Sequence, residues 1–192
     1  MINTSYLRQL GEKYRATGQA RRRLSELASQ AQHLAKQAIF VIQRGELTSG
    51  ASLLKQSEDI LKQGRSLFRK VEEIESIGSW RAALEEYAEA KLFLTYLKTN
   101  KVEKITSFSI PLEVYIGALS DFVGELVRYA VMLATDGKVE EVKKLVKVST
   151  VIVGELSAMN LTGNLRSKFD QSKQHLRKLE DIQYDLSIKR HG

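Results

Sequence analysis

Cysteine is absent from this 192-residue chain, and proline occurs only once, at Pro111. Without cysteine, the chain can form no disulfide bond and can offer no thiolate ligand to a metal ion. Histidine is also scarce, since only His33, His175 and His191 are present, and we expect all three to be surface residues. This composition argues against a histidine-rich zinc site, so any metal ion would be held by oxygen ligands.

Signals for strands and for membrane segments are missing as well. The sequence has no run of alternating β-branched residues between turn dipeptides, which argues against a β-sandwich or an α/β fold. No stretch reaches ~18 uncharged apolar residues, and the beginning of the chain contains no apolar signal-peptide core. There is no glycine-rich phosphate loop, no serine–histidine couple and no aromatic-rich strand for stacking bases. We therefore expect an all-α, soluble, cytoplasmic protein that does not enter a membrane.

Hydrophobic residues make up 43% of the chain, and no obvious linker interrupts it. One domain over residues 1–192 with a sizeable core is therefore expected. Apolar residues recur at helical spacing, which predicts a single-domain bundle of about six to seven long helices. Their expected ranges are about 4–44 (one helix, or two with a break near Gly18), 49–74, 79–100, 111–135, 139–159 and 165–188. Ser79 and Ser109 are the expected N-caps of the third and fourth of these helices, and Pro111 is expected in the first turn of the fourth.

The stretch 111–135 is apolar on nearly every side and yet carries Asp121 and Glu125 in its middle. A helix that is apolar all round belongs in the interior of a bundle. The two acids lie one turn apart on the same face, and removing ionised carboxylates from water without a partner is costly. Either a cation lies beside them, therefore, or they line a polar cavity. Gly117 and Gly124 share a face of this helix, where they would let another backbone come close.

A second acidic pair, Glu86 and Glu89, lies on a partly apolar face of the 79–100 helix, whereas Glu85 is expected to face solvent. Packed together, the two helices would form a pocket of four carboxylates, Glu86, Glu89, Asp121 and Glu125. Such an all-oxygen pocket suits Mg²⁺, Mn²⁺ or Ca²⁺, whereas a di-iron bundle would show Glu-x-x-His on two helices. Hard divalent ions held by acids commonly serve phosphoryl transfer. A basic chain with this pocket is therefore a candidate metal-dependent nuclease.

The net charge is +7 and the sequence pI is about 9.5, a balance that favours an anionic partner such as nucleic acid. The excess is concentrated in residues 1–45, which hold eight bases and two acids. Arg15 and the run Arg21, Arg22 and Arg23 are candidate phosphate contacts, although a solvated helix face is an equally open interpretation. An unbroken helix over 4–44 would span roughly 60 Å, and this length suggests contacts outside the protomer.

Several stretches of the sequence carry a family resemblance. LEEYAEAKLF (84–93), PLEVYIGALSDFVGELVRYAV (111–131) and LRSKFDQSKQHLRKLEDIQYDLSIKR (165–190) resemble the corresponding stretches of the translin superfamily. ARRRL…KQAIFVIQRG (20–45) is similar to the first helix of that superfamily. The likeness covers most of the chain, and it is most specific in the central helix and in the terminal YDLSI-K-R.

The motifs E-Y-A-E (86–89) and D-F-V-G-E (121–125) resemble the catalytic branch of the superfamily, translin-associated factor X (TRAX), in an archaeal-type form. This resemblance implies an α-helical, Mg²⁺-dependent or Mn²⁺-dependent endoribonuclease that uses Glu86, Glu89, Asp121 and Glu125. Eukaryotic TRAX works with translin in a hetero-octamer that encloses RNA. Because this chain is shorter and its ending is more translin-like, the resemblance implies a homo-oligomer, an octamer, that binds RNA, with single-stranded DNA as an alternative ligand.

Three functions remain open from the sequence. The first is a metal-dependent endoribonuclease inside an oligomeric helical shell. The second is a non-catalytic, translin-like binder of single-stranded RNA or DNA, in which the acids are structural. The third is a helical assembly protein whose basic face binds nothing specific. Intact carboxylates favour the first over the second, and the basic first helix favours both over the third.

Overall fold

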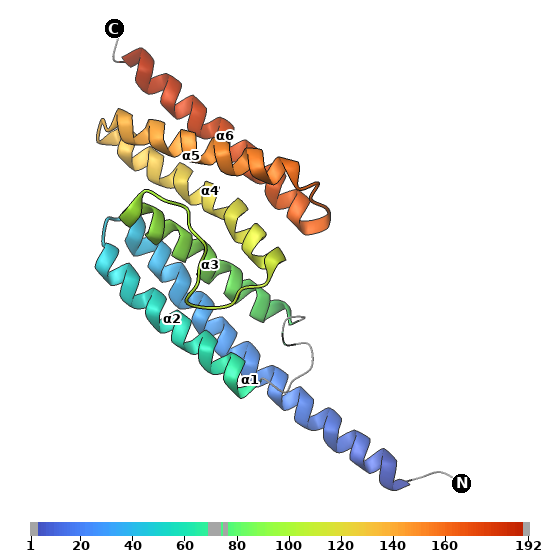
Figure 1. The fold of residues 1–192 in the computed structure, drawn as a ribbon. Helices are drawn as coiled ribbons and strands as arrows, with labels where there is room; N and C mark the ends of the chain where they lie inside the picture. The colour runs from blue at the N-terminus through green and yellow to red at the C-terminus, as the bar shows by residue number, and fades with distance from the viewer. Residues whose placement is uncertain (1–3, 69–73, 75–76, 190–192) are drawn as a thin grey trace.

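The computed structural model describes residues 4–68, 74 and 77–189, and these ranges contain helices and connecting segments but no strand (Figure 1). The helices are α1 (Thr4–Gln43), α2 (Leu47–Leu67), α3 (Gly78–Thr99), α4 (Leu112–Thr135), α5 (Val139–Ala158) and α6 (Gly163–Lys189). The prediction of an all-α bundle is confirmed, and the described part of the chain holds six of the predicted six to seven helices. None of these helices combines the length and the apolar character that a membrane span needs.

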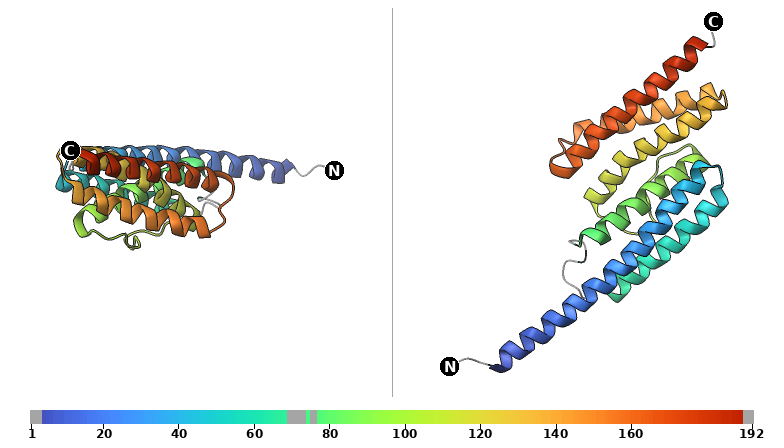
Figure 2. Two further views of the ribbon diagram at one scale, coloured as in Figure 1. Left: turned by 90° about the horizontal axis from the view of Figure 1, so that it is seen from above. Right: turned by 180° about the vertical axis from the view of Figure 1, so that it is seen from behind.

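The helices pack as two groups of three. In the first group α1 contacts both α2 and α3, and in the second α4 contacts both α5 and α6. The contact between α3 and α4 joins the groups, so these two helices lie in the middle of the molecule (Figure 1). Seen from above, α1 and α6 lie along the same side of the molecule, and the beginning of α1 extends beyond the other helices (Figure 2).

Large aromatic side chains of α3 and α4 form part of the core. Trp80, Tyr87, Phe93 and Phe122 are completely buried. The ring of Phe93 lies 6.5 Å from that of Phe122 and 5.9 Å from that of Tyr129, at tilted and edge-to-face angles that aromatic pairs prefer. These contacts confirm the prediction that the 111–135 stretch occupies the interior.

The ends of several helices differ from the predictions. Helix α1 runs unbroken through Gly18, so the two-helix alternative is wrong. Helix α2 begins two residues earlier than predicted and ends at Leu67. Residues 69–73 of the predicted range 49–74 lie outside the described residues. Gly45 ends α1 with a φ of +85°, a backbone conformation that glycine adopts without strain.

The two predicted serine caps are also wrong. The N-cap positions of α3 and α4 are Ile77 and Pro111, and neither cap makes a side-chain hydrogen bond. Ser79 instead pairs its hydroxyl with that of Ser25 on α1, with 3.0 Å between the oxygens. Ser109 uses its backbone carbonyl, which accepts a 2.7 Å hydrogen bond from Arg65 on α2. Both serines therefore hold elements together across the fold and cap no helix.

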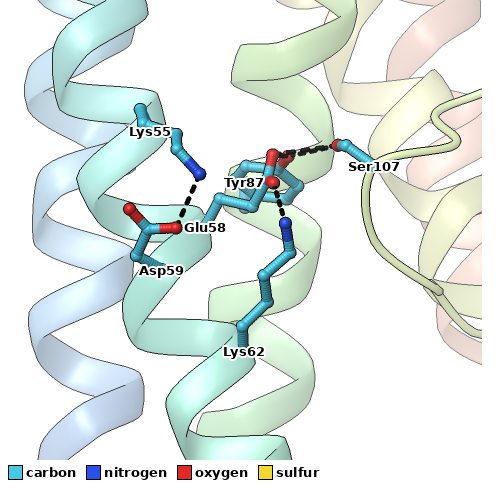
Figure 3. Close-up of polar contacts among 6 residues, drawn as sticks. All are labelled: Lys55, Glu58, Asp59, Lys62, Tyr87 and Ser107. Atoms are coloured by element: carbon cyan, nitrogen blue, oxygen red, sulfur yellow. Dashed lines mark hydrogen bonds and ion pairs between the residues drawn. The ribbon is translucent and has the colours of Figure 1, made fainter.

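A buried acid fixes the connection between α3 and α4 to helix α2 (Figure 3). Glu58 accepts hydrogen bonds from the hydroxyl of Tyr87 and, at 2.9 Å, from that of Ser107, while the ammonium of Lys62 lies 2.5 Å from its other oxygen. Burial acts to raise the pKa of Glu58, but these three hydrogen bonds outweigh it and lower the pKa to about 2. Glu58 is therefore charged and fully partnered, as a structural acid should be.

Candidate active site

The four predicted acids lie close together where α3 packs against α4. Glu86 and Glu89 come from α3, and Asp121 and Glu125 come from α4. Glu89 is only 9% exposed. Its pKa is raised well above the ordinary value, first by burial and then by the charges of Glu125, Asp121 and Glu86. Because the charges of the other three acids all act on Glu89, the four acids lie in one region of the α3–α4 contact.

Helix α1 covers this cluster from one side. The side-chain amide of Gln43 donates to a carboxylate oxygen of Glu125 at 2.8 Å and to its backbone carbonyl at 3.0 Å. Glu86 accepts a hydrogen bond from Gln32 and has the ammonium of Lys36 at 3.8 Å. Burial nevertheless raises the pKa of Glu86, because Lys36 and Gln32 offset the loss of water only in part.

Helix α6 also contacts the acids, through Lys168. The ammonium of Lys168 lies 2.5 Å from a carboxylate oxygen of Asp121 and 2.9 Å from one of Glu85. The prediction that Glu85 faces solvent is wrong, because its side chain is only one-quarter exposed and forms this ion pair. Gly117 makes the arrangement possible, since a Cβ at that position would collide with the Glu85 carboxylate.

A histidine also reaches the cluster, contrary to the prediction that all three are surface residues. The ring of His175 on α6 packs against Gly124 so closely that a Cβ there would lie 2.8 Å from the ring carbon Cε1. Burial lowers the pKa of His175, and the charges of Asp121 and Glu125 partly oppose this shift. Gly117 and Gly124 thus make room for side chains of neighbouring helices, whereas the sequence suggested a close backbone.

The donor set suits a hard divalent cation in type and in charge. Four carboxylates crowd together, and within the described ranges Glu89 has neither a hydrogen bond nor an ion pair to offset its burial. In the present side-chain arrangement, however, no group of three or more acids or histidines among the described residues converges closely enough to hold a metal ion. Asp121 is directed to Lys168, and Glu125 is directed to Gln43. A cation site at these four acids would therefore require Asp121 and Glu125 to leave their present partners.

The four predicted phosphate-binding arginines lie elsewhere. Arg15, Arg21, Arg22 and Arg23 are exposed on α1, before Leu24, the first buried residue of that helix. The guanidinium of Arg23 pairs with Glu26 at 2.9 Å. This part of α1 extends past the rest of the molecule (Figure 1), whereas the acids contact α1 further along, from Gln32 to Gln43. The structure does not bring the arginines and acids of one protomer together.

The sequence pattern did not predict that Lys168, His175 and Gln43 lie beside the acids. Lys168 and His175 are seven residues apart, and so lie on one face of α6, beside the buried Phe169 and Leu179. Polar residues that border a buried stripe at helical spacing are a weak signal, but one that could have singled out this pair. Nothing in the local sequence around Gln43 distinguishes it from a solvent-exposed glutamine.

Comparison with known proteins places these features in a family. The family model described as Translin family matches residues 19–190. Translin of Gallus gallus is 27% identical over 129 residues, in an alignment that covers 57% of this chain and 55% of that protein. The chain therefore spans about half the length of this curated relative.

Solved structures share the fold. The apo form of NeC3PO is 21% identical with a TM-score of 0.86, and the match covers 97% of this chain and 98% of that one. AfC3PO in complex with duplex RNA is 18% identical with a TM-score of 0.89 and coverages of 97% and 99%. At these identities the likeness concerns the fold alone.

Proposed function

The chain belongs to the Translin family, and on this basis we propose that it is a metal-dependent endoribonuclease that cleaves RNA inside an oligomeric helical shell. The observation that carries the proposal is the proximity of three carboxylates to that of the buried Glu89, which forms no ion pair with any base on the described residues. A purely structural acid has the opposite surroundings, as Glu58 demonstrates. RNA as the substrate is supported by the complex of the similarly folded AfC3PO with duplex RNA.

Each part of the acid cluster has a chemical role in this proposal. Glu86, Glu89, Asp121 and Glu125 would hold Mg²⁺ or Mn²⁺, whose chemistry in such a site is to polarise the phosphate and to lower the pKa of a bound water. Gln43 positions Glu125 through its two hydrogen bonds. Helices α1 and α6 flank the acids and reduce their contact with bulk water, which strengthens their attraction for a cation.

The test of catalysis is incubation of the purified protein with labelled RNA in Mg²⁺, in Mn²⁺ and in EDTA. Asp121→Asn keeps the shape of the side chain and removes one charge, so cleavage should fall by orders of magnitude while RNA binding stays near normal. Asp170→Asn is the matched control, because Asp170 forms ion pairs with Arg166 and Lys173 at the surface of α6, and it should cleave normally. Cleavage that persists in EDTA or in Asp121→Asn would contradict the proposal.

A non-catalytic, translin-like binder of single-stranded RNA or DNA is the second candidate. The ion pair of Asp121 with Lys168 and the hydrogen bonds of Glu125 with Gln43 favour it, because partnered acids can be structural. RNA binding without cleavage under any metal condition would establish this alternative. Competition with single-stranded DNA would then report whether the ligand must be RNA.

Phosphate contacts in this proposal come from Arg15, Arg21 and Arg22, with Arg23 a weaker donor because it already pairs with Glu26. On single strands each neutralised phosphate contributes roughly −0.7 to the slope of log affinity against log salt. Changing Arg21 and Arg22 to alanine should therefore flatten this slope by about 1.4. The matched control removes two exposed lysines of α5, Lys144 and Lys147, and should leave the slope unchanged. Equal changes in both variants would show that only net charge matters.

The oligomer in this proposal is supported by the beginning of α1. Leu7, Leu10 and Tyr14 lie on one face of the helix at spacings of three and four residues, and all three are more than half exposed, Tyr14 to 81%. A helical segment without packing contacts is only marginally stable in water. We infer that another protomer covers this stripe. The predicted homo-octamer is one assembly that this contact would allow.

A further inference from the structure

Lys168 occupies the position of a cation within the acid cluster. Its ammonium bridges Asp121 on α4 and Glu85 on α3, at 2.5 and 2.9 Å. Its side chain is 17% exposed, whereas the other bases of the cluster, Lys36 and Arg128, are 58% and 63% exposed. Lys168 is therefore the base of this group that is held most firmly among the acids.

The surrounding helices are shaped for this ion group. Gly117 lies directly beneath it, and a Cβ there would collide with Glu85 and lie 3.5 Å from Cδ of Lys168. The aliphatic part of Lys168 thus packs on the bare backbone of α4, while Glu85 holds the ammonium from the α3 side. Glu85 differs from the four acids of the cluster, because its carboxylate pairs with Lys168 at 2.9 Å and the largest charge effects on Glu89 come from other residues.

Asp121 is thus shared between two alternatives. It either pairs with Lys168, as in this structure, or turns to the cation that Glu86, Glu89 and Glu125 would bind with it. The two arrangements exclude each other for electrostatic reasons, because an ammonium within a few ångströms of a divalent cation repels it strongly. This competition also explains why no three of the described acids converge on one point in the present arrangement.

We propose that Lys168 is a built-in counter-ion that Asp121 exchanges for the metal ion, and that Glu85 is the anchor which retains Lys168 when the exchange occurs. This inference rests on the proposed metal-dependent function. Lys168 is a positioning residue in this scheme, and Glu85 is not a metal ligand. The exchange keeps Asp121 neutralised in the metal-free protein and sets the metal affinity lower than the four acids alone would give.

The test measures Mn²⁺ affinity directly, by titration calorimetry or by the electron paramagnetic resonance signal of free Mn²⁺, with no RNA present. The variant is the double substitution Glu85→Gln with Lys168→Met, since Lys168→Met alone would leave the Glu85 charge without its partner and could impair folding. The double variant removes one charge of each sign, so its net charge equals that of the wild type. Lys173→Met is the control, because Lys173 is a lysine of the same helix that pairs with Asp170 outside the cluster.

The double variant should bind Mn²⁺ roughly 10-fold or more tightly than the wild type. A cation beside a carboxylate lowers its affinity for a proton by about one to three powers of ten, and Lys168 opposes the binding of Mn²⁺ to Asp121 by the same charge effect. Lys173→Met should match the wild type. Affinity in the double variant that is equal to or weaker than that of the wild type overturns the counter-ion role. If the double variant gives that result but Asp121→Asn abolishes Mn²⁺ binding, the proposed metal site is supported and only the counter-ion role is wrong. Failure of both the wild type and the double variant to bind Mn²⁺ overturns the metal site and the exchange together.

Discussion

Glu58 and Glu89 are both buried acids, and their surroundings shift their pKa values in opposite directions. Around Glu58, the hydrogen bonds from Lys62, Tyr87 and Ser107 outweigh the effect of burial. Around Glu89, burial and three neighbouring acids act in the same direction. At the scale of single residues, the charged form of Glu58 therefore stabilises the folded state, whereas the charged form of Glu89 destabilises it.

Glu58→Gln should destabilise the protein at neutral pH by on the order of 3 kcal/mol, which follows from a pKa of about 2 against an ordinary value of 4.5. Because the folded pKa is the lower one, this stability is present above pH 4.5 and is lost as the pH falls toward 2. Urea unfolding at pH 7 and at pH 3 measures both effects. The control Asp59→Asn removes an exposed acid that pairs with Lys55. A stability gap between wild type and Glu58→Gln that does not narrow at pH 3 would contradict this account.

Glu89→Gln should stabilise the metal-free protein at pH 7. Its folded pKa is raised, so the wild type loses stability as the pH rises above the unfolded value of about 4.5. The melting temperature of the variant in EDTA should be a few degrees higher, since ~1 kcal/mol corresponds to about 2–4 °C in a protein of this size. The difference should vanish below pH 4, and Mn²⁺ should raise the melting temperature of the wild type more than that of the variant. A variant that melts lower in EDTA would make Glu89 a structural acid.

At the scale of the helices, small residues decide how closely neighbours approach. Gly64 of α2 is buried against the indole of Trp80 on α3, and a Cβ there would lie 2.7 Å from that ring. From sequence, Gly64 only weakens its helix by ~1 kcal/mol relative to alanine. In the structure it instead allows α2, α1 and α3 to close around the largest buried side chain.

Gly64→Ala should therefore destabilise the protein by roughly 1–3 kcal/mol despite its better helix propensity, because the rigid indole must move. Gly154→Ala is the matched helical control. Gly154 is exposed on α5, and a Cβ added there would meet no atom within 4 Å, so alanine should stabilise by about 0.5–1 kcal/mol. Denaturant unfolding of both variants measures the difference, and equal stabilisation by both would show that α2 and α3 are not in close contact at Gly64.

At the scale of the whole molecule, the two parts of α1 differ in burial. The part from Leu24 onward is buried in the first group of helices. The part before it carries an exposed apolar stripe and four exposed arginines, and the beginning of this helix extends beyond the other helices (Figure 2). In the proposed assembly, this segment would bring the arginines of one protomer near RNA bound at the acids of another. The arginines and acids could then contact the same RNA although they lie apart within a single chain.

Light scattering at micromolar concentration should give a large oligomer for the wild type and a much smaller mass for the double variant Leu7→Glu with Leu10→Glu. Helical content and unfolding of the rest of the protein should change little, because neither leucine is buried. Val151→Glu is the control, since Val151 is similarly exposed on α5. A monomeric wild type would remove the enclosed-shell proposal, and a double variant with wild-type mass would place the interface elsewhere.

The amino-acid sequence was sufficient to predict the class of fold. Helical periodicity is a local property, so it predicted the helices and the burial of α4. It also placed two acidic pairs on partly apolar helix faces, and the packing of α3 against α4 brings Glu86 and Glu89 near Asp121 and Glu125. The structure does not test the metal-binding and catalytic roles of these acids, the octamer or the phosphate contacts. Those remain predictions, together with the cytoplasmic location and the single domain.

The surroundings of the acids, in contrast, depend on how the helices pack. Lys168 meets Asp121 across 47 positions of the chain, and Gln43 meets Glu125 across 82. Such pairings depend on how α1 and α6 lie against α3 and α4, and a change of one helical position would turn these polar side chains away. Local periodicity does not encode that rotation, since it records which face of a helix is buried but not which residue of a distant helix lies against it.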